Sequence, residues 1–117
     1  MGNRFSPEIF VGESDKWHHQ PLTTALLERL RREGFAGATV FQGIAGFGAR
    51  SVLHTSHILR LSEDLPIVIE VVDTQERIDR LLVLLDEMVP EGLVTLEKAR
   101  VVKYSPGNRL VDPAARS

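Results

Sequence analysis

The segment PIVIEVVD, residues 66–73, is the clearest strand in the chain. Its β-branched residues form a nearly continuous run, which is typical of strands that are covered on both faces. Glu70 lies in the middle of this run and is therefore the first candidate functional residue. At the end of the run, Asp73 is predicted to cap a helix, and Glu76 is placed to complete a capping box.

The rest of the chain predicts two helices and three further strands. After Asp73 a stripe of apolar residues keeps helical spacing as far as Pro90: Ile78, Leu81, Leu82, Leu85 and Met88. An earlier helix is predicted to begin at Pro21 and end at Gly34. The remaining strands are predicted over residues 8–12, 36–44 and 94–104. This order predicts an α+β, ferredoxin-like βαββαβ fold, with an antiparallel sheet and both helices on one face.

The composition restricts the classes of function. A chain of 117 residues predicts a single domain, which we assign to residues 1–104, with residues 105–117 as a flexible tail. The formal net charge of −2 disfavours nucleic acid as a partner. The absence of cysteine excludes disulfides, and the lack of long apolar runs predicts no membrane insertion and a cytoplasmic protein.

The connection over residues 45–65 is longer than a hairpin requires, which favours a functional loop. Gly43, Gly46 and Gly48 lie where this loop begins. Closely spaced glycines are typical of a turn or bulge, but they also allow consecutive backbone amides to form an anion-binding nest. Both interpretations stay open from the residues alone. Because the predicted strands are apolar on both sides, we also expect the chain to form an oligomer.

Several motifs together resemble a known family, the PII-like proteins numbered 190 among the domains of unknown function. They are GESDKW, GFAGATVFQGIAGFGA, HTSHILRLSEDLPIVIEVVD and DEMVPEGLVTLEKARVV. The resemblance implies a ferredoxin-like subunit of a homotrimer, in which residues 45–65 form the partner-facing T-loop. It also implies a signalling or regulatory protein rather than an enzyme.

The resemblance implies a nucleotide site in clefts between subunits. The implied effector is an adenine nucleotide (ATP, ADP or AMP), alone or with Mg²⁺, or another small anion. The residues carried over are Gly46, Phe47, Gly48, Arg50, Glu70, Lys98 and Lys103. The chain departs from the family pattern at two places. Ala49 separates Arg50 from the Gly-Phe-Gly motif of residues 46–48, and Glu97 stands where the family pattern has a glycine-rich turn. A carboxylate there repels phosphate.

The partner implied by the resemblance is a membrane transporter or a fluoride channel. The T-loop residues expected to contact it are Ser51, His54, His57 and Arg60. A CutA-like trimer that binds a divalent metal is the alternative, with His54 and His57 as weak ligand candidates and His18 or His19 as a third ligand. A small enzyme that uses Glu70 as a base is a further alternative. If Glu70 is not a catalytic base, its expected ion-pair partner is Arg100 or Lys103.

Overall fold

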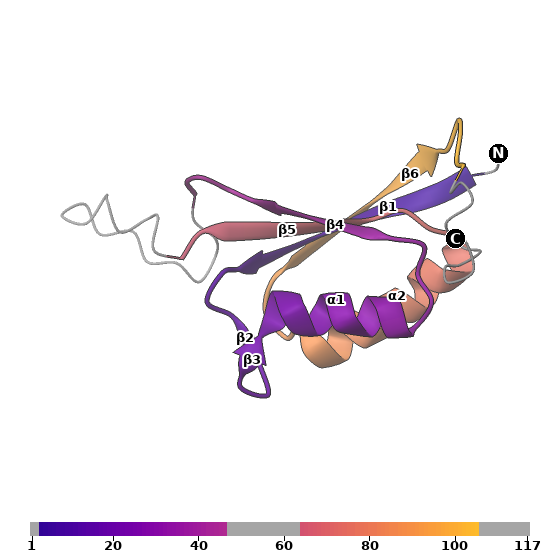
Figure 1. Cartoon of the computed structure of the whole chain (residues 1–117). Helices are drawn as coiled ribbons and strands as arrows, with labels where there is room; N and C mark the ends of the chain where they lie inside the picture. The colour runs from indigo at the N-terminus through magenta and orange to yellow at the C-terminus, as the bar shows by residue number, and fades with distance from the viewer. Residues whose placement is uncertain (1–2, 47–63, 106–117) are drawn as a thin grey trace, which may run out of the picture.

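A four-stranded antiparallel sheet forms one layer of the molecule (Figure 1), and the computed structural model describes residues 3–46 and 64–105. The strands lie in the spatial order β4-β5-β1-β6. Their bounds are Asn3–Gly12 for β1, Ala38–Gln42 for β4, Pro66–Val71 for β5 and Leu93–Arg100 for β6. Helices α1 (Leu22–Arg32) and α2 (Gln75–Met88) cover the same face of this sheet (Figure 1). The predicted ferredoxin-like fold is confirmed.

The core lies between the sheet and the two helices. Alternate residues of the central strands point toward the helices, so that Ile9 and Ile69 are completely buried. The helices contribute residues at helical spacing to the same cluster, chiefly Leu22, Leu26, Leu30, Ile78, Leu81, Leu85 and Met88. Leu82, which the sequence placed in this stripe, is 36% exposed, and Leu84 is buried instead. The helix is rotated relative to the predicted stripe because the core contacts, and not the spacing alone, decide which leucines are covered.

Helix α1 ends as the sequence predicts. Gly34 has φ +86°, a backbone conformation that favours glycine. Its N–H donates to the Arg31 carbonyl at 3.2 Å, and the Phe35 N–H donates to the Leu30 carbonyl at 3.1 Å. This pair of bonds is the Schellman motif, which satisfies the last carbonyls of the helix.

The predicted cap of α2 is wrong by one residue. Thr74 is the cap, and its side chain accepts a hydrogen bond from the Arg77 N–H at 3.3 Å. The residue three positions after this cap is Arg77 rather than Glu76, so no capping box forms. The Asp73 carboxylate is engaged in other contacts, described with the site below.

Several strand boundaries differ from the prediction because they depend on tertiary pairing, and β4 is shorter than the predicted 36–44. Strand β1 begins at Asn3 instead of residue 8, since it pairs with β6 along its length, from Asn3 opposite Arg100 to Phe10 opposite Leu93. Pro7 lies in this strand at a gap in the β1–β5 pairing, where its missing N–H has no hydrogen bond to make. Strand β6 ends at Arg100 rather than residue 104.

A short hairpin, β2 (Lys16–Trp17) and β3 (Gln20–Pro21), occupies a region predicted as loop. Its turn consists of His18 and His19, both with positive φ, which is the geometry of a type I′ turn. The His18 ring stacks on Trp17 with centroids 4.1 Å apart.

The sheet face opposite the helices is not covered by any element in the described part of the chain (Figure 1). The strand register places four apolar residues in one row across this open face, from β4 to β6: Phe41, Val68, Phe10 and Leu93. The burial of β5 alternates along its length, with only every second residue fully buried. The expectation of a strand covered on both faces is therefore not met within a single chain.

Candidate functional site

A groove of about 530 Å³ lies at the end of the sheet where β5 leads into α2. Residues from β1, from the start of β4, from the end of β5, from the first turn of α2 and from the segment after β6 contribute to it. Its charged, polar and aromatic lining includes Arg4, Thr39, Glu70, Asp73, Arg77 and Tyr104. The groove thus combines two arginines, two carboxylates and an aromatic ring drawn from distant parts of the sequence.

Glu70 reaches the groove from the open face of the sheet. In the register, its neighbours are Glu8 on β1 and Thr39 on β4. Glu70 is half-buried and has no ion-pair partner in residues 3–46 and 64–105. The expected pairing with Arg100 or Lys103 is not formed among the described residues. For Arg100 the reason is that β1 lies between β5 and β6.

Asp73 holds one wall of the groove in place. Its side chain is 3% exposed and accepts three hydrogen bonds: from the Ala36 N–H at 3.0 Å, the Thr74 N–H at 2.8 Å and Arg77 Nη1 at 3.2 Å. Burial alone would raise the pKa of Asp73, but the two backbone N–H groups and the Arg77 guanidinium outweigh burial and lower the pKa below its ordinary value. Asp73 is therefore a charged anchor that joins the segment after α1 to the start of α2.

The two arginines of the groove differ in whether their guanidinium groups are available to bind a ligand. Arg77 is committed to Asp73. Arg4 donates only to the neighbouring Asn3 carbonyl, at 3.0 Å, and no described carboxylate pairs with it. Sequence reasoning missed both residues. The four-residue spacing of Asp73 and Arg77 could have indicated their pairing, whereas Arg4 precedes the predicted first strand and carries no local signal.

The predicted site residues that the structure describes do not come together within one chain. Gly46 has φ +149° and packs against Pro66 at the start of β5, about 13 Å of strand away from Glu70. Lys98 pairs with Phe5, which places its side chain on the helix-covered side of β6, opposite to the face of Glu70. Lys103 lies in the segment after β6, next to Tyr104 of the groove.

Gly43 provides a structural explanation for part of the glycine cluster. Its N–H continues the ladder by donating to the Pro66 carbonyl at 2.8 Å. A Cβ at Gly43 would come within 2.7 Å of the Pro66 ring, so the close approach of the two segments requires glycine. At Gly43, the interpretation as a strand-end turn is therefore sufficient.

The remaining predicted residues lie outside the described part of the chain. They are Phe47, Gly48, Arg50, Ser51, His54, His57 and Arg60. Among the residues that the structure describes, no three histidine or acidic side chains are grouped so that they could hold a metal ion. None of the helices there has both the length and the apolar character that crossing a membrane requires.

The strand order and the helix layer define an α+β domain with a ferredoxin-like fold. A solved structure with this fold is that of CPII bound to ADP and bicarbonate, from Thiomonas intermedia K12. It matches with a TM-score of 0.61 and 20% sequence identity, over 87% of this chain and 91% of that chain.

The chain belongs to the DUF190 family, whose model is described as "Uncharacterized ACR" and matches residues 7–101. A UPF0166 protein of Methanocaldococcus jannaschii is 39% identical over 82% of this chain and 89% of its own length. A UPF0166 protein of Aquifex aeolicus is 36% identical over 80% of this chain and 89% of its own length. The family resemblance inferred from the sequence motifs is thus confirmed.

Proposed function

We propose that this protein is a PII-like regulatory protein whose groove binds a small anionic effector, with an adenine nucleotide as the favoured candidate. The observation that carries the proposal is the groove itself, which is lined by the Glu70 carboxylate and the Arg4 guanidinium, neither of which forms an ion pair with a described residue. A volume of about 530 Å³ lies within the range of ordinary small-molecule sites. The solved CPII with the same fold holds ADP and bicarbonate, which supports an effector of this class.

The chemistry of the groove fits the parts of a nucleotide. The Glu70 carboxylate is placed to accept hydrogen bonds from a base amine or a ribose hydroxyl. Tyr104, which is 59% exposed, offers an aromatic face on which a base can stack. Arg4 is the cation available for phosphate or for bicarbonate.

The geometry favours a ligand site shared between subunits. Lys98 and Glu70 lie on opposite faces of the sheet, and Lys98 does not line the groove of its own chain, which supports a ligand that contacts Glu70 of one chain and Lys98 of another. The uncovered row that contains Phe10, Phe41 and Val68 gives a physical reason for assembly, since burial of apolar surface favours association. A homotrimer with shared clefts satisfies both requirements.

In this proposal the effector acts by selecting one conformation of residues 45–65, because a ligand shifts an equilibrium only through differential contacts with two states. Residues Ser51, His54, His57 and Arg60 then contact the regulated partner, for which a membrane transporter is the candidate.

Thermal unfolding in the presence of ATP, ADP, AMP, each with and without Mg²⁺, and bicarbonate tests the effector. A ligand present at 100 times its dissociation constant stabilises the native state by about 2.7 kcal/mol. A panel without any shift at millimolar concentration would overturn the proposal.

Calorimetry with a ligand found in this way then tests the groove. We expect Arg4→Gln to weaken binding about tenfold, as for the loss of one hydrogen bond to a charged group. Arg31→Gln, the same change at an exposed position of α1, is the matched control and should leave binding unchanged. Equal affinities of the Arg4→Gln variant and the wild type would contradict this placement of the site.

A further variant tests whether the site is shared. Lys98→Ala should weaken binding only in the assembled protein. Mixed assemblies of Glu70→Gln and Lys98→Ala subunits should recover ligand binding at those sites in which an intact Glu70 of one subunit faces an intact Lys98 of another. Failure of any mixture to recover binding would contradict a cleft built from these two residues.

A further inference from the structure

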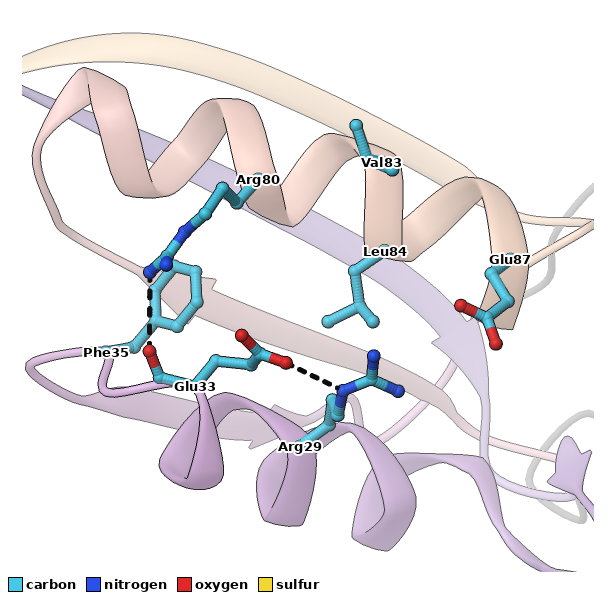
Figure 2. A pocket seen from close by; sticks show the side chains of 7 residues that line it. All are labelled: Arg29, Glu33, Phe35, Arg80, Val83, Leu84 and Glu87. Atoms are coloured by element: carbon cyan, nitrogen blue, oxygen red, sulfur yellow. Dashed lines mark hydrogen bonds and ion pairs between the residues drawn. The ribbon is translucent and has the colours of Figure 1, made fainter.

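A second, smaller pocket lies between the two helices (Figure 2). Its volume is about 120 Å³, which is small for a cofactor but adequate for a single aliphatic side chain. Phe35 and Leu84 provide apolar walls, and charged residues from both helices surround them (Figure 2).

Both arginines of this pocket are engaged within the chain. Arg29 Nε lies 3.1 Å from Glu33 Oε2. Arg80 donates to the Glu33 carbonyl at 3.3 Å, and its guanidinium carbon lies 5.9 Å from the centre of the Phe35 ring. Figure 2 shows Arg80 folded against Phe35, while Glu87 stands at the other end of the pocket with no dashed contact. Glu87 has no ion-pair partner among residues 3–46 and 64–105.

The outward side of α2 continues this pattern. Helical spacing places Val83 in the middle of a stripe of acidic residues, which we call the α2 stripe: Glu76, Asp79, Val83, Asp86 and Glu87. Val83 lines the pocket and is 72% exposed. The carboxylates of the stripe are exposed, and none forms an ion pair in the part of the chain that the structure describes. Arg77 and Arg80, the basic residues of the same helix, are turned to Asp73 and Phe35 instead.

We propose that the α2 stripe and its pocket are a docking surface for a basic segment of a partner protein. An aliphatic side chain of that segment occupies the pocket against Leu84 and Val83. Lysine or arginine side chains on either side of it pair with the carboxylates of the stripe. The complementarity of charge selects this occupant, because the exposed charges of the stripe are all negative and form no ion pair with a described residue.

The same charges argue against other occupants. A phosphate or another anion would be repelled by the unpaired carboxylates of the stripe, and Arg29 already pairs with Glu33. A second copy of this chain that docked through the same surface would place like charges against each other, which is costly. The surface lies on the helix layer and does not depend on the nucleotide proposal, so either can fail alone.

The test uses the full 117-residue protein and three fluorescein-labelled synthetic peptides of equal length: one of lysine and leucine, one of glutamate and leucine, and one of lysine and serine. We expect saturable binding of the lysine and leucine peptide by fluorescence anisotropy. The other two should bind at least about tenfold more weakly, because one has the wrong charge and the other has no apolar anchor. Absence of saturable binding by the first peptide, or equal binding of the glutamate peptide, would overturn the proposal.

Matched variants locate the surface. Val83→Ser should weaken binding by at least about fivefold, as expected when a side chain that contributes to binding is truncated. Leu82→Ser removes an exposed apolar side chain from the same helix but outside the pocket, and should have no effect. Glu87→Gln should weaken binding and reduce its dependence on salt, whereas Glu28→Gln on α1 should do neither.

Equal effects of the Val83 and Leu82 variants would overturn this location. Light scattering gives a further check, because a wild-type assembly that Val83→Ser dissociates would show that a second copy occupies the surface instead.

Discussion

Asp73 connects the segment after α1 to the start of α2, and its replacement by asparagine gives a sharp test of the described site. The carboxylate is 3% exposed and accepts hydrogen bonds at 2.8, 3.0 and 3.2 Å. Asparagine keeps one acceptor oxygen, so one of the backbone N–H groups of Ala36 and Thr74 must face an amide NH₂ group instead. The ion pair with Arg77 is lost as well.

The expected cost follows from these contacts. Loss of a hydrogen bond to a buried charged group costs about 1.5–3 kcal/mol, so we expect Asp73→Asn to destabilise the fold by about 2–3 kcal/mol. At about 4 °C per kcal/mol for a domain of this size, the Tm falls by about 8–12 °C. Urea unfolding followed by circular dichroism, at one fixed protein concentration, measures the difference.

Asp79→Asn is the matched control, since Asp79 lies exposed on α2, the helix that Asp73 precedes, and forms no ion pair with any described residue. Its replacement should change the free energy of unfolding by less than about 0.5 kcal/mol. A destabilisation by Asp73→Asn no larger than that of this control would show that Asp73 does not anchor α2.

The stability that the Asp73 carboxylate contributes depends on pH. The contacts of Asp73 lower its pKa below the ordinary value of 3.8, so the native state binds this proton less readily than the unfolded chain. The stabilisation is complete above the unfolded pKa and disappears as the pH falls through the lower folded pKa. The difference between wild type and Asp73→Asn should therefore stay constant from about pH 5 to 7 and narrow below about pH 4. A difference that stayed constant down to pH 2 would contradict the lowered pKa.

Two further predictions concern the C-terminal end of α1 and the open sheet face. Gly34→Ala should destabilise the fold by about 1 kcal/mol, because Gly34 has positive φ. Gly37→Ala should not, because Gly37 has ordinary φ and open space where a Cβ would lie. Equal unfolding midpoints of the two variants would contradict this. Phe41→Glu on the open face should lower the assembled mass in light scattering without loss of helical circular dichroism, while Ile44→Glu, at a position 93% exposed, should leave the mass unchanged. An assembly that tolerates Phe41→Glu would show that this face does not hold the subunits together.

Much of the fold could be predicted because its signals are local. The β-branched run that became β5, the apolar periodicity of the helices and the glycine that ends α1 depend on residues within a few positions of each other. The start of β1 could not be predicted, because residues before Pro7 become strand through pairing with β6 and with Asp73, both far away in sequence. For the same reason the cap of α2 moved from Asp73 to Thr74, once Asp73 accepted a hydrogen bond from Ala36.

The sequence by itself determined the order of the elements, the family and the choice of Glu70 as a residue of interest. The tertiary structure alone decided what surrounds Glu70. The register placed Glu8 and Thr39 beside it, the N-terminal part of β1 brought Arg4 to the same groove, and Lys98 came to lie on the other face. The physical reason is that a shift of one residue in strand register turns every side chain to the opposite face, and register depends on pairing between distant segments.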